Sequence, residues 1–326
     1  MPSLAEVRLM PELANAVEIE NLVKRFGTFV AVDHLNLTVG KGEVFGFLGP
    51  NGAGKSTTIR MLCGLLTPTS GRAMVAGYDV TQNPEAVRQN IGYMSQKFSL
   101  YNDLTVIENL RLFAGLYSVP RSELKERMAW ALEMSNLVGQ ESRLTGTLSG
   151  GWKQRLALGC AVLHRPPIVF LDEPTSGVDP IARRQFWDLI HEMAAHGVTV
   201  FVTTHYMEEA EYCNRLALIF RGQMVALGTP TELKRNHMQG ELLLVECEPL
   251  GAAVEALQTS PDVMDAAVFG NALHLVVKSA EAAAPAIRAY LTERSIAVSR
   301  IEQIRPTLED VFVSLTTTHR AEEGRV

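Results

Sequence analysis

The chain has 326 residues, of which 47% are hydrophobic and 20% are charged, and this balance is that of a folded protein rather than a disordered or fibrous one. Its 30 basic and 36 acidic residues give a net charge of -6, which disfavours a nucleic-acid partner. The length exceeds that of a usual single domain and predicts one large and one small domain.

The four cysteines lie far apart and form neither a Cys-x-x-Cys pair nor a zinc pattern, so we interpret them as reduced thiols in the cytoplasm. The first twelve residues lack the order of a signal peptide. The most hydrophobic stretch, Leu156 to Leu171, is interrupted by His164, Arg165 and two prolines. Spanning a bilayer needs about 20 apolar residues, so we expect any transport channel to be formed by another chain.

Strand patterns dominate the beginning of the chain, at Val17 to Val23, Leu35 to Val39 and Val44 to Leu48. The third ends in a glycine-rich loop, and a helical pattern follows from Ser56 to Leu66. From about Thr105 to Leu163 the pattern is helical again. The first half therefore reads as a mostly β-strand opening, a strand-loop-helix unit and a helical insert.

Strands and helices then alternate, at Ile168 to Leu171, Ile181 to Ala195, Val198 to Thr203 and Leu216 to Phe220. This alternation predicts a largely parallel sheet flanked by helices, so the fold class is α/β.

A short helical pattern at Thr231 to Arg235 precedes a second alternation, with the order strand, helix, strand, strand, helix, strand. The ranges are 241–247, 251–258, 263–269, 272–278, 281–293 and 296–304. This order predicts a small α+β domain of the split-βαβ, ferredoxin-like kind. Because it carries no reactive cluster, a regulatory or dimer-supporting role is favoured over a catalytic one.

The glycine-rich loop fits the pattern Gly, four residues, Gly-Lys-Ser, placed between a strand and a helix. Its residues are Gly49, Pro50, Asn51, Gly52, Ala53, Gly54, Lys55, Ser56 and Thr57. Backbone N–H groups and the positive end of the following helix suit a β-phosphate, Lys55 can bridge the β- and γ-phosphates, and the Ser56 hydroxyl can bind Mg²⁺. The loop alone leaves ATPase, GTPase and kinase open, but the absence of Asn-Lys-x-Asp weakens the GTPase reading.

Two carboxylates, Asp172 and Glu173, follow the buried-strand pattern that begins at Ile168. Such a position lies at the carboxyl edge of the sheet, beside the phosphate loop. We expect Asp172 to hold Mg²⁺ through water and Glu173 to orient and polarise the attacking water. The alternative is a solvated acidic loop.

The segment from Leu148 to Arg155, with Ser149, Gly150 and Gly151 at the start of a helical pattern, resembles the signature of the ABC ATPases. Together with the phosphate loop and the paired acids in this order, it identifies a resemblance to ATP-binding subunits of ABC transporters that covers roughly residues 17–235. The resemblance implies a P-loop NTPase domain with a RecA-like core, an N-terminal antiparallel β-subdomain and a helical subdomain.

Further residues stand at positions that this family uses: Phe26 for adenine stacking, Gln96 near Mg²⁺, Asp179 in the D-loop and His205 as the switch. The resemblance implies a head-to-tail dimer in which Ser149, Gly150 and Gly151 of one subunit contact ATP held by the other. Chemically, a histidine at the end of a strand can hydrogen-bond the γ-phosphate and the attacking water. We therefore expect Lys55, Glu173 and His205 to be catalytic.

Three residues depart from the family pattern: Phe26 replaces a common Tyr, Trp152 a common Gln, and Val178 a common Leu. Phe26 keeps a ring face for stacking and Val178 keeps an apolar contact. None of the three removes a reacting group, so catalysis is expected to survive, while the role of Trp152 stays open.

Two segments resemble those of bacterial drug exporters of the daunorubicin-resistance type: Lys97 to Thr105 and Arg305 to Phe312. In the first, Phe98, Leu100 and Tyr101 suit either a pocket for a membrane subunit's coupling helix or an ordinary core. The second also reads as a capped terminal helix. Both segments favour export.

The domain assignment is a tail at 1–16, an ABC ATPase domain at 17–238 with its helical subdomain at about 97–163, an accessory domain at 239–318 and a tail at 319–326. The resemblance implies an exporter ATPase that uses ATP and Mg²⁺, forms a homodimer and joins separate membrane permease subunits at the cytoplasmic face of a bacterial inner membrane. The alternatives are a soluble ABC ATPase of translation or repair, which usually has paired cassettes or a coiled coil, and an uptake ATPase.

Overall fold

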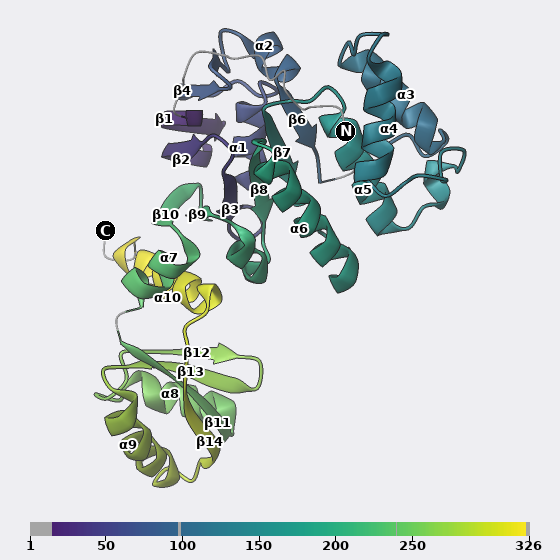
Figure 1. The fold of residues 1–326 in the computed structure, drawn as a ribbon. Coiled ribbons are helices and arrows are strands. Elements are labelled where there is room, and N and C mark those ends of the chain that lie inside the picture. Colours follow the sequence, from purple (N-terminus) through teal and green to yellow (C-terminus); the bar gives the residue numbers. More distant parts are fainter. Residues whose placement is uncertain (1–14, 97–98, 239, 324–326) are drawn as a thin grey trace. The chain divides into compact units, whose positions relative to one another are not determined.

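The computed structural model describes residues 15–96, 99–238 and 240–323, which divide into two compact units between residues 224 and 225 (Figure 1). The division falls inside strand β10 (Gln223–Gly228), whereas the expected domain boundary lies after residue 238, so that boundary stays a prediction. Most of the expected N-terminal tail at 1–16 lies outside the described residues.

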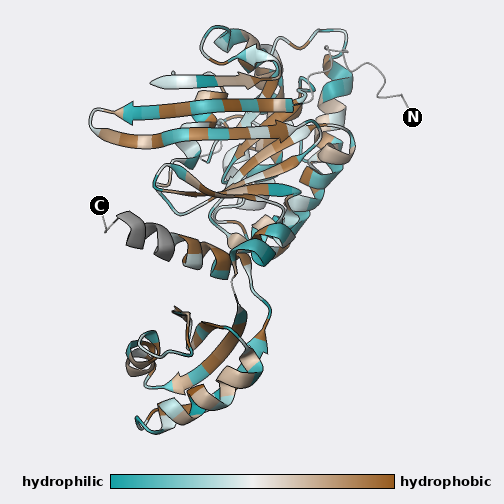
Figure 2. Cartoon of the chain, turned by 90° about the vertical axis from the view of Figure 1, so that its left-hand side faces the viewer, coloured by the Kyte–Doolittle hydropathy of each residue, from teal (hydrophilic) through white to brown (hydrophobic). Residues whose placement is uncertain are grey.

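The first unit begins with a four-stranded antiparallel sheet in the order β2-β1-β4-β5. Its strands are β1 (Asn15–Phe26), β2 (Phe29–Gly40), β4 (Ser70–Val75) and β5 (Tyr78–Asp79). Apolar residues recur along β1 and β2, as the alternating colours of these two long strands in Figure 2 show, and this gives the sheet one buried face. The expected N-terminal antiparallel subdomain is confirmed.

A six-stranded sheet in the order β10-β9-β3-β8-β7-β6 forms the centre of this unit. Besides β10, its strands are β3 (Val44–Leu48), β6 (Ile91–Met94), β7 (Ile168–Asp172), β8 (Thr199–Thr204) and β9 (Arg215–Phe220). The pairs β3/β9, β3/β8, β7/β8 and β6/β7 are all parallel. Strands β3, β7 and β8 are buried along their whole length; β3 and β7 are accordingly almost continuously apolar, whereas β8 has threonines at both ends.

Helices cover both faces of the parallel sheet. Helix α1 (Lys55–Leu62) packs into the core that the two sheets share, where the ring of Phe201 lies 5.4 Å from those of Phe45, Phe47 and Phe170. Helix α6 (Pro180–Ala195) packs on the other face through Phe186, Trp187 and Ile190, among others. The remaining short elements of this core are α2 (Pro84–Gln89) and η2 (Met207–Tyr212). The predicted α/β core is confirmed.

The helical insert contains α3 (Val106–Leu116), α4 (Leu124–Met134), the short η1 (Thr145–Thr147) and α5 (Gly150–Val162). Thr105 and Glu108 form a capping box at the start of α3, which satisfies two backbone donors. Met128 and Leu132 of α4 are buried against α3 and α5 in a core of the insert's own. This confirms the predicted helical subdomain; Phe98 lies outside the described residues, while Tyr101 is exposed.

The second unit contains a four-stranded antiparallel sheet in the order β12-β13-β11-β14. Its elements are α7 (Pro230–His237), β11 (Glu241–Glu248), α8 (Leu250–Gln258), β12 (Asp265–Phe269), β13 (Ala272–Val277), α9 (Ala280–Thr292), β14 (Ala297–Ile304) and α10 (Leu308–Glu323). Helices α8 and α9 share an apolar core with the sheet. This strand order, with β11 and β12 separated by β13, confirms the predicted ferredoxin-like fold.

Two helix ends differ from the sequence expectation. Helix α1 ends at Leu62 rather than Leu66, because Gly64 adopts φ 64° and the Leu65 N–H turns back to the Arg60 carbonyl at 2.9 Å. Helix α10 continues to Glu323, beyond the tail boundary expected at 319, through residues with good helix propensity such as Glu322.

The longest helices in the described part of the chain are α6 and α10, with 16 residues each. The hydrophobic stretch from Leu156 to Leu171 is divided between the end of α5 and strand β7. None of the helices formed by the described residues has both the length and the apolar character needed to cross a bilayer.

Candidate nucleotide site

The glycine-rich loop connects β3 to α1, as its sequence predicts. A Cβ atom added to Gly49 would lie 2.2 Å from the Ile219 carbonyl oxygen, and one added to Gly54 would lie 2.4 Å from that of Ala31. Gly54 also has φ 105°, so both positions require glycine. The first-turn N–H groups of α1 lack partners within the helix. The loop therefore has the backbone shape and the dipole that bind a phosphate.

Lys55 is buried beside the acidic edge of the sheet, with 4% of its surface exposed. Its Nζ atom donates to the carbonyl oxygens of Gly49 at 2.8 Å and Pro50 at 3.1 Å, and it forms an ion pair with Glu173 Oε1 at 3.0 Å. A buried ammonium needs such partners because its desolvation is costly. Lys55 is thus held by two loop carbonyl oxygens and one carboxylate oxygen.

Asp172 ends strand β7 and is buried at the base of the site. Its Oδ1 accepts hydrogen bonds from Thr203 Oγ1 at 2.8 Å and from Ser56 Oγ at 3.0 Å. Burial raises the pKa of the Asp172 carboxyl, while the hydrogen bonds from Thr203 and Ser56 oppose this shift. Ser56 and Asp172, expected to share Mg²⁺, therefore lie together.

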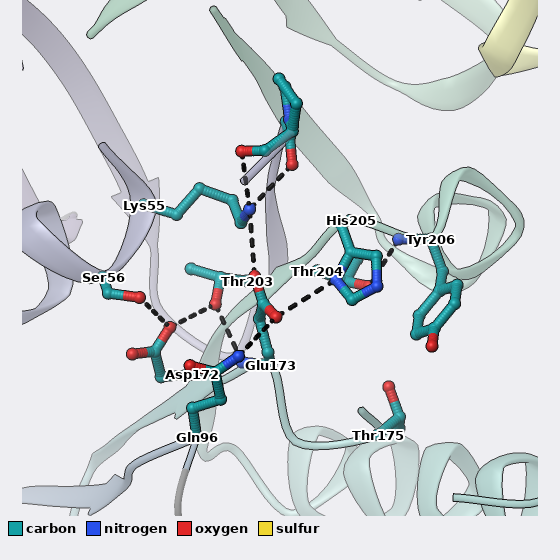
Figure 3. A network of polar contacts seen from close by, with 12 residues as sticks. Lys55, Ser56, Gln96, Asp172, Glu173, Thr175, Thr203, Thr204, His205 and Tyr206 are labelled. Atoms are coloured by element: carbon teal, nitrogen blue, oxygen red, sulfur yellow. Dashed lines mark hydrogen bonds and ion pairs between the residues drawn. The ribbon is translucent and has the colours of Figure 1, made fainter. Parts of the chain in front are cut away.

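Glu173 lies at the centre of the polar network in Figure 3 and contacts side chains from three other segments. Besides the pair with Lys55, its Oε2 accepts from Gln96 Nε2 at 3.0 Å and lies 3.1 Å from His205 Nδ1. Its backbone has φ 48°, and its N–H donates to Thr203 Oγ1 at 3.0 Å, which fixes the turn after β7. A non-glycine residue with positive φ is strained, a feature that clusters at functional sites.

The structure therefore brings together all the expected catalytic residues: Lys55, Glu173 and His205. Gln96, which was expected near Mg²⁺, contacts Glu173 here, through the carboxylate oxygen that Lys55 does not pair with. Each of these side chains stands at or just beyond the carboxyl end of a parallel strand or in the phosphate loop, where ligands bind in open α/β sheets.

The signature residues lie elsewhere in this unit, at the start of α5. Ser149 occupies the N-cap position, and both Ser149 and Gly150 are exposed. An added Cβ at Gly150 would meet no atom within 4 Å. Asp179 caps α6, where its Oδ1 accepts from the Ala182 N–H at 2.9 Å. These residues present polar and backbone groups to the surface.

Phe26 is also separate from the Glu173 network, because it ends strand β1 in the antiparallel sheet. Its ring is 50% exposed, and the Lys24 ammonium lies 5.2 Å from the ring centroid. An exposed ring face is available for stacking. The adenine contact expected of Phe26 stays a prediction.

The residues present fit the two groups that such a site implies. The glycine cradle and the helix start suit the phosphates of ATP. Ser56 Oγ and the Asp172 carboxylate are hard oxygen donors, 3.0 Å apart, of the kind that Mg²⁺ prefers in nucleotide sites.

Sequence reasoning missed two polar residues of this region. Thr203 donates to Asp172 and accepts from the Glu173 N–H, and so positions both acids. Gln154, fully buried in α5, donates to the Pro174 carbonyl at 2.5 Å. Thr203 could have been found from its place near the end of a strand expected beside the acidic one, whereas Gln154 needed the packing of α5.

Two family models match the chain. The model described as "ABC transporter" matches residues 32–176, and the model described as "ATP-binding protein DrrA1-3-like, C-terminal domain" matches residues 228–316. The first covers the phosphate loop, the signature and the acid pair. The second covers most of the second compact unit.

Curated relatives agree with these models. The Linearmycin resistance ATP-binding protein LnrL of Bacillus subtilis (strain 168) is 34% identical over 304 residues, which are 92% of this chain and 98% of the relative. The Daunorubicin resistance ATP-binding protein DrrA3 of Streptomyces coeruleorubidus is 36% identical, covering 94% and 97%. The Probable multidrug ABC transporter ATP-binding protein YbhF of Escherichia coli (strain K12) is 52% identical over 225 residues, but these are only 39% of its length.

Solved ATP-binding cassettes align with about two thirds of the chain. One, titled "Structure of ATP binding subunit of ABC transporter", aligns with a TM-score of 0.62 and 32% identity over 68% of this chain and 92% of the other. A second, titled as the dimeric post-hydrolysis state of the ATP-binding cassette MJ0796 with ADP and Pi, has a TM-score of 0.60 and 27% identity over 65% and 98%. The chain belongs to the family of ABC transporter ATP-binding proteins, whose ATP-binding domain hydrolyses ATP to power transport.

Proposed function

We propose that this chain is the ATP-hydrolysing subunit of an ABC exporter. It uses ATP with Mg²⁺, acts as a head-to-tail pair, and drives efflux of drugs or other amphipathic compounds through separate permease subunits at the cytoplasmic face of a bacterial inner membrane. The observation that carries the proposal is the convergence of Lys55, Gln96 and His205 on the Glu173 carboxylate.

In this proposal the side chains divide the chemistry of phosphoryl transfer to water. Glu173 orients the attacking water and takes up its proton, and His205, 3.1 Å from Glu173 Oε2, holds the water and the γ-phosphate in line. Ser56 and Asp172 would hold Mg²⁺, which would supply positive charge to neutralise the phosphate oxygens. Each role follows from the donor or acceptor chemistry of a side chain that is held by hydrogen bonds or an ion pair within the site.

Lys55 has a second role, because it occupies Glu173 Oε1 at 3.0 Å. A phosphate in the loop competes for the Lys55 ammonium and is itself a charge-assisted acceptor. When Lys55 moves to the phosphates, it releases one oxygen of Glu173 to accept from water. ATP binding thereby frees Glu173 to act as the base for the attacking water.

A shared site between two subunits explains the exposed signature. Ser149 and Gly150 are at the surface of the first unit, at the N-terminus of α5, where backbone N–H groups and the helix dipole favour an anion. In the head-to-tail pair, this anion is the γ-phosphate of the ATP that the second copy holds. The similar cassette solved as a dimer supports this arrangement.

The second unit favours export over the two alternatives. The matching C-terminal model is named for DrrA1-3-like proteins, and relatives named for daunorubicin and linearmycin resistance align over nearly their whole length, second unit included. The transported compound is determined by the membrane subunits.

The test of hydrolysis compares the purified unmodified chain with Glu173→Gln. The substitution keeps the shape of the side chain but removes the proton acceptor, so phosphate release should fall at least about a hundredfold while ATP binding persists. Phosphate release is measured with Mg²⁺ and ATP, and binding with a fluorescent ATP analogue. If Glu173→Gln released phosphate at the unmodified rate, the assignment of the base would be wrong.

The test of transport is co-purification from the native membrane in mild detergent. The exporter proposal predicts that integral membrane subunits remain with the chain. Recovery of the chain together with a solute-binding protein would support uptake, and recovery without any membrane protein would favour the soluble alternative.

A further inference from the structure

One face of helix α6 docks onto the segment that follows His205. Arg183, Trp187 and His191 lie four residues apart and therefore on the same face of α6. The Trp187 ring lies 5.3 Å from that of Tyr212, and His191 Nε2 lies 2.8 Å from the Tyr212 carbonyl oxygen. The short helix η2 (Met207–Tyr212) is thus held by α6.

At the N-terminal end of this contact lies a buried carboxylate, Glu209, with 1% of its surface exposed. Its Oε1 accepts from Thr175 Oγ1 at 2.5 Å and lies 3.5 Å from Arg183 Nε. Its Oε2 and the Arg183 Nε are buried and make no hydrogen bond within the described residues. An ion pair at 3.5 Å with unsatisfied atoms on both partners is weak evidence for a stabilising role, so the neighbouring site is the place to look for its role.

Arg183 joins three segments of the site. Its guanidinium stacks on the Tyr206 ring at 4.2 Å from the centroid, and its Nη2 donates to the Val178 carbonyl at 3.5 Å. Tyr206 follows His205, with the two ring centroids 4.1 Å apart, and Val178 precedes Asp179. One side chain therefore touches the D-loop, the switch segment and Glu209.

Thr175 connects the same carboxylate to the catalytic acid. It stands two residues after Glu173, and Figure 3 shows it near Tyr206 and the Glu173 network. On the other side of this loop, Gln154 of the signature helix donates to the Pro174 carbonyl. The loop that carries Glu173 is thereby fastened to α5, and through Glu209 to η2.

We infer that Arg183, Tyr206 and Glu209 form a positioning network that holds His205 against Glu173 and couples this contact to the D-loop at Asp179. The inference rests on the proposed hydrolysis. None of the three touches the phosphate loop or the Mg²⁺ residues in this structure, so the network acts on the geometry of the transfer step. A displacement of about 1 Å in a catalytic group is sufficient to lower a rate up to a hundredfold.

The experiment compares Glu209→Gln with the unmodified chain and with Arg165→Gln. Arg165 forms an exposed ion pair with Glu126 at 2.8 Å in the same unit and serves as the matched control. Glu209→Gln should lower kcat about ten- to a hundredfold, with the KM for ATP and the binding of a fluorescent ATP analogue within about twofold of the unmodified values. Arg165→Gln should leave all three unchanged.

A second pair of variants applies if Glu209→Gln fails to fold. Tyr206→Phe keeps the ring face for the guanidinium and should retain the unmodified kcat, whereas Tyr206→Leu removes it and should lower kcat with KM retained. An unchanged kcat in Tyr206→Leu, or in a folded Glu209→Gln, would overturn the inference. So would parallel losses in kcat, ATP binding and melting temperature, which indicate a merely structural role.

A readout without turnover separates this inference from the proposed function. The ring signal of His205 in a ¹H–¹³C NMR spectrum, assigned with His205→Gln, should shift in Glu209→Gln and not in Arg165→Gln. An unshifted signal would contradict the network. Failure of the unmodified chain to release phosphate would instead contradict the proposed hydrolysis.

Discussion

The two compact units differ in where they place buried charge. In the first unit, Lys55, Asp172, Glu173 and Glu209 are each exposed by 6% or less, and all belong to the site or its supporting network. In the described part of the second unit, the buried carboxylate is Asp310. It accepts hydrogen bonds from the N–H and the hydroxyl of Thr307, and it lies 2.6 Å from the Nδ1 atom of His274 on β13.

The difference teaches how buried charge is used. In the second unit, the Asp310 carboxylate completes a helix start and fastens α10 to the sheet, which is a structural task. In the first unit, the buried Asp79 likewise has a structural task, because it accepts two backbone N–H groups just after β5. Lys55, Asp172 and Glu173 are instead gathered at one edge of the parallel sheet at a cost in desolvation. We propose that this gathering of charge is retained for the chemistry of the site. Damage to the first set should therefore change function, and damage to the second unit should change stability.

The largest effect is expected for Lys55→Met. Methionine keeps most of the volume but removes the charge, so Glu173 is left buried without its cation and the phosphates lose theirs. ATP affinity should fall at least about a hundredfold, as for other truncated buried charge pairs. Titration with a fluorescent ATP analogue measures it, with Lys41→Met, at an exposed turn, as the control. Equal ATP affinity in both variants would contradict the assignment of Lys55 to the chemistry of the site.

A smaller effect, on stability alone, is expected for Leu273→Ala. Leu273 is fully buried in the core of the second unit, and its truncation should cost about 3 kcal/mol of unfolding free energy. The three tryptophans, Trp130, Trp152 and Trp187, all lie in the first unit, so their fluorescence reports on that unit.

Denaturant unfolding followed by circular dichroism should therefore show that the second unit of Leu273→Ala unfolds at a lower denaturant concentration. The fluorescence transition and the rate of phosphate release should stay unchanged. Val268→Ala is the control, since Val268 is 53% exposed on β12. A large loss of phosphate release in Leu273→Ala would show that the second unit takes part in turnover.

The last effect is absent at neutral pH and develops only in acid; it concerns His164 in the first unit. Burial lowers the pKa of His164 from 6.5 to about 4, a shift that the hydrogen bond to the Ile91 carbonyl opposes. The unfolded chain therefore binds this proton first, and stability falls as pH drops from 6.5 toward 4, by up to about 3 kcal/mol. Denaturant unfolding followed by tryptophan fluorescence at several pH values should show this loss. In His164→Gln, the unfolding free energy should depend less on pH. An equally steep loss in His164→Gln would assign the effect to other groups.

The acid pair and the phosphate loop were predictable because each follows a recognisable strand. The acids follow the apolar run of β7, and the phosphate loop follows that of β3. The second unit was predictable for a similar reason, since its strands and helices alternate cleanly. Parallel strands end at the same edge, so the approach of these groups followed from strand type alone.

The contacts of Gln96 and Arg183 were not predictable in this way. Gln96 follows β6, a four-residue strand whose pattern is interrupted by Gly92, where an added Cβ would lie 2.5 Å from the Ala161 carbonyl oxygen. The close approach of α5 dictates this glycine, and a single sequence does not reveal it. The contact of Arg183 with Tyr206 likewise depends on how α6 packs, which spacing alone does not determine.

The central claim is that two copies share each ATP site, and mixing two inactive variants tests it most directly. Lys55→Met disables the phosphate loop, and Gly150→Asp places a charge in the signature at a position where an added Cβ meets no atom within 4 Å, so the fold should tolerate it.

In a mixed pair, one site carries both defects and the other carries none. The account predicts that each variant alone releases almost no phosphate, while an equal mixture recovers about a quarter of the unmodified rate, because half of the pairs are mixed and each has one intact site. If the mixture stayed as inactive as its components although both variants were folded, the shared site would be contradicted.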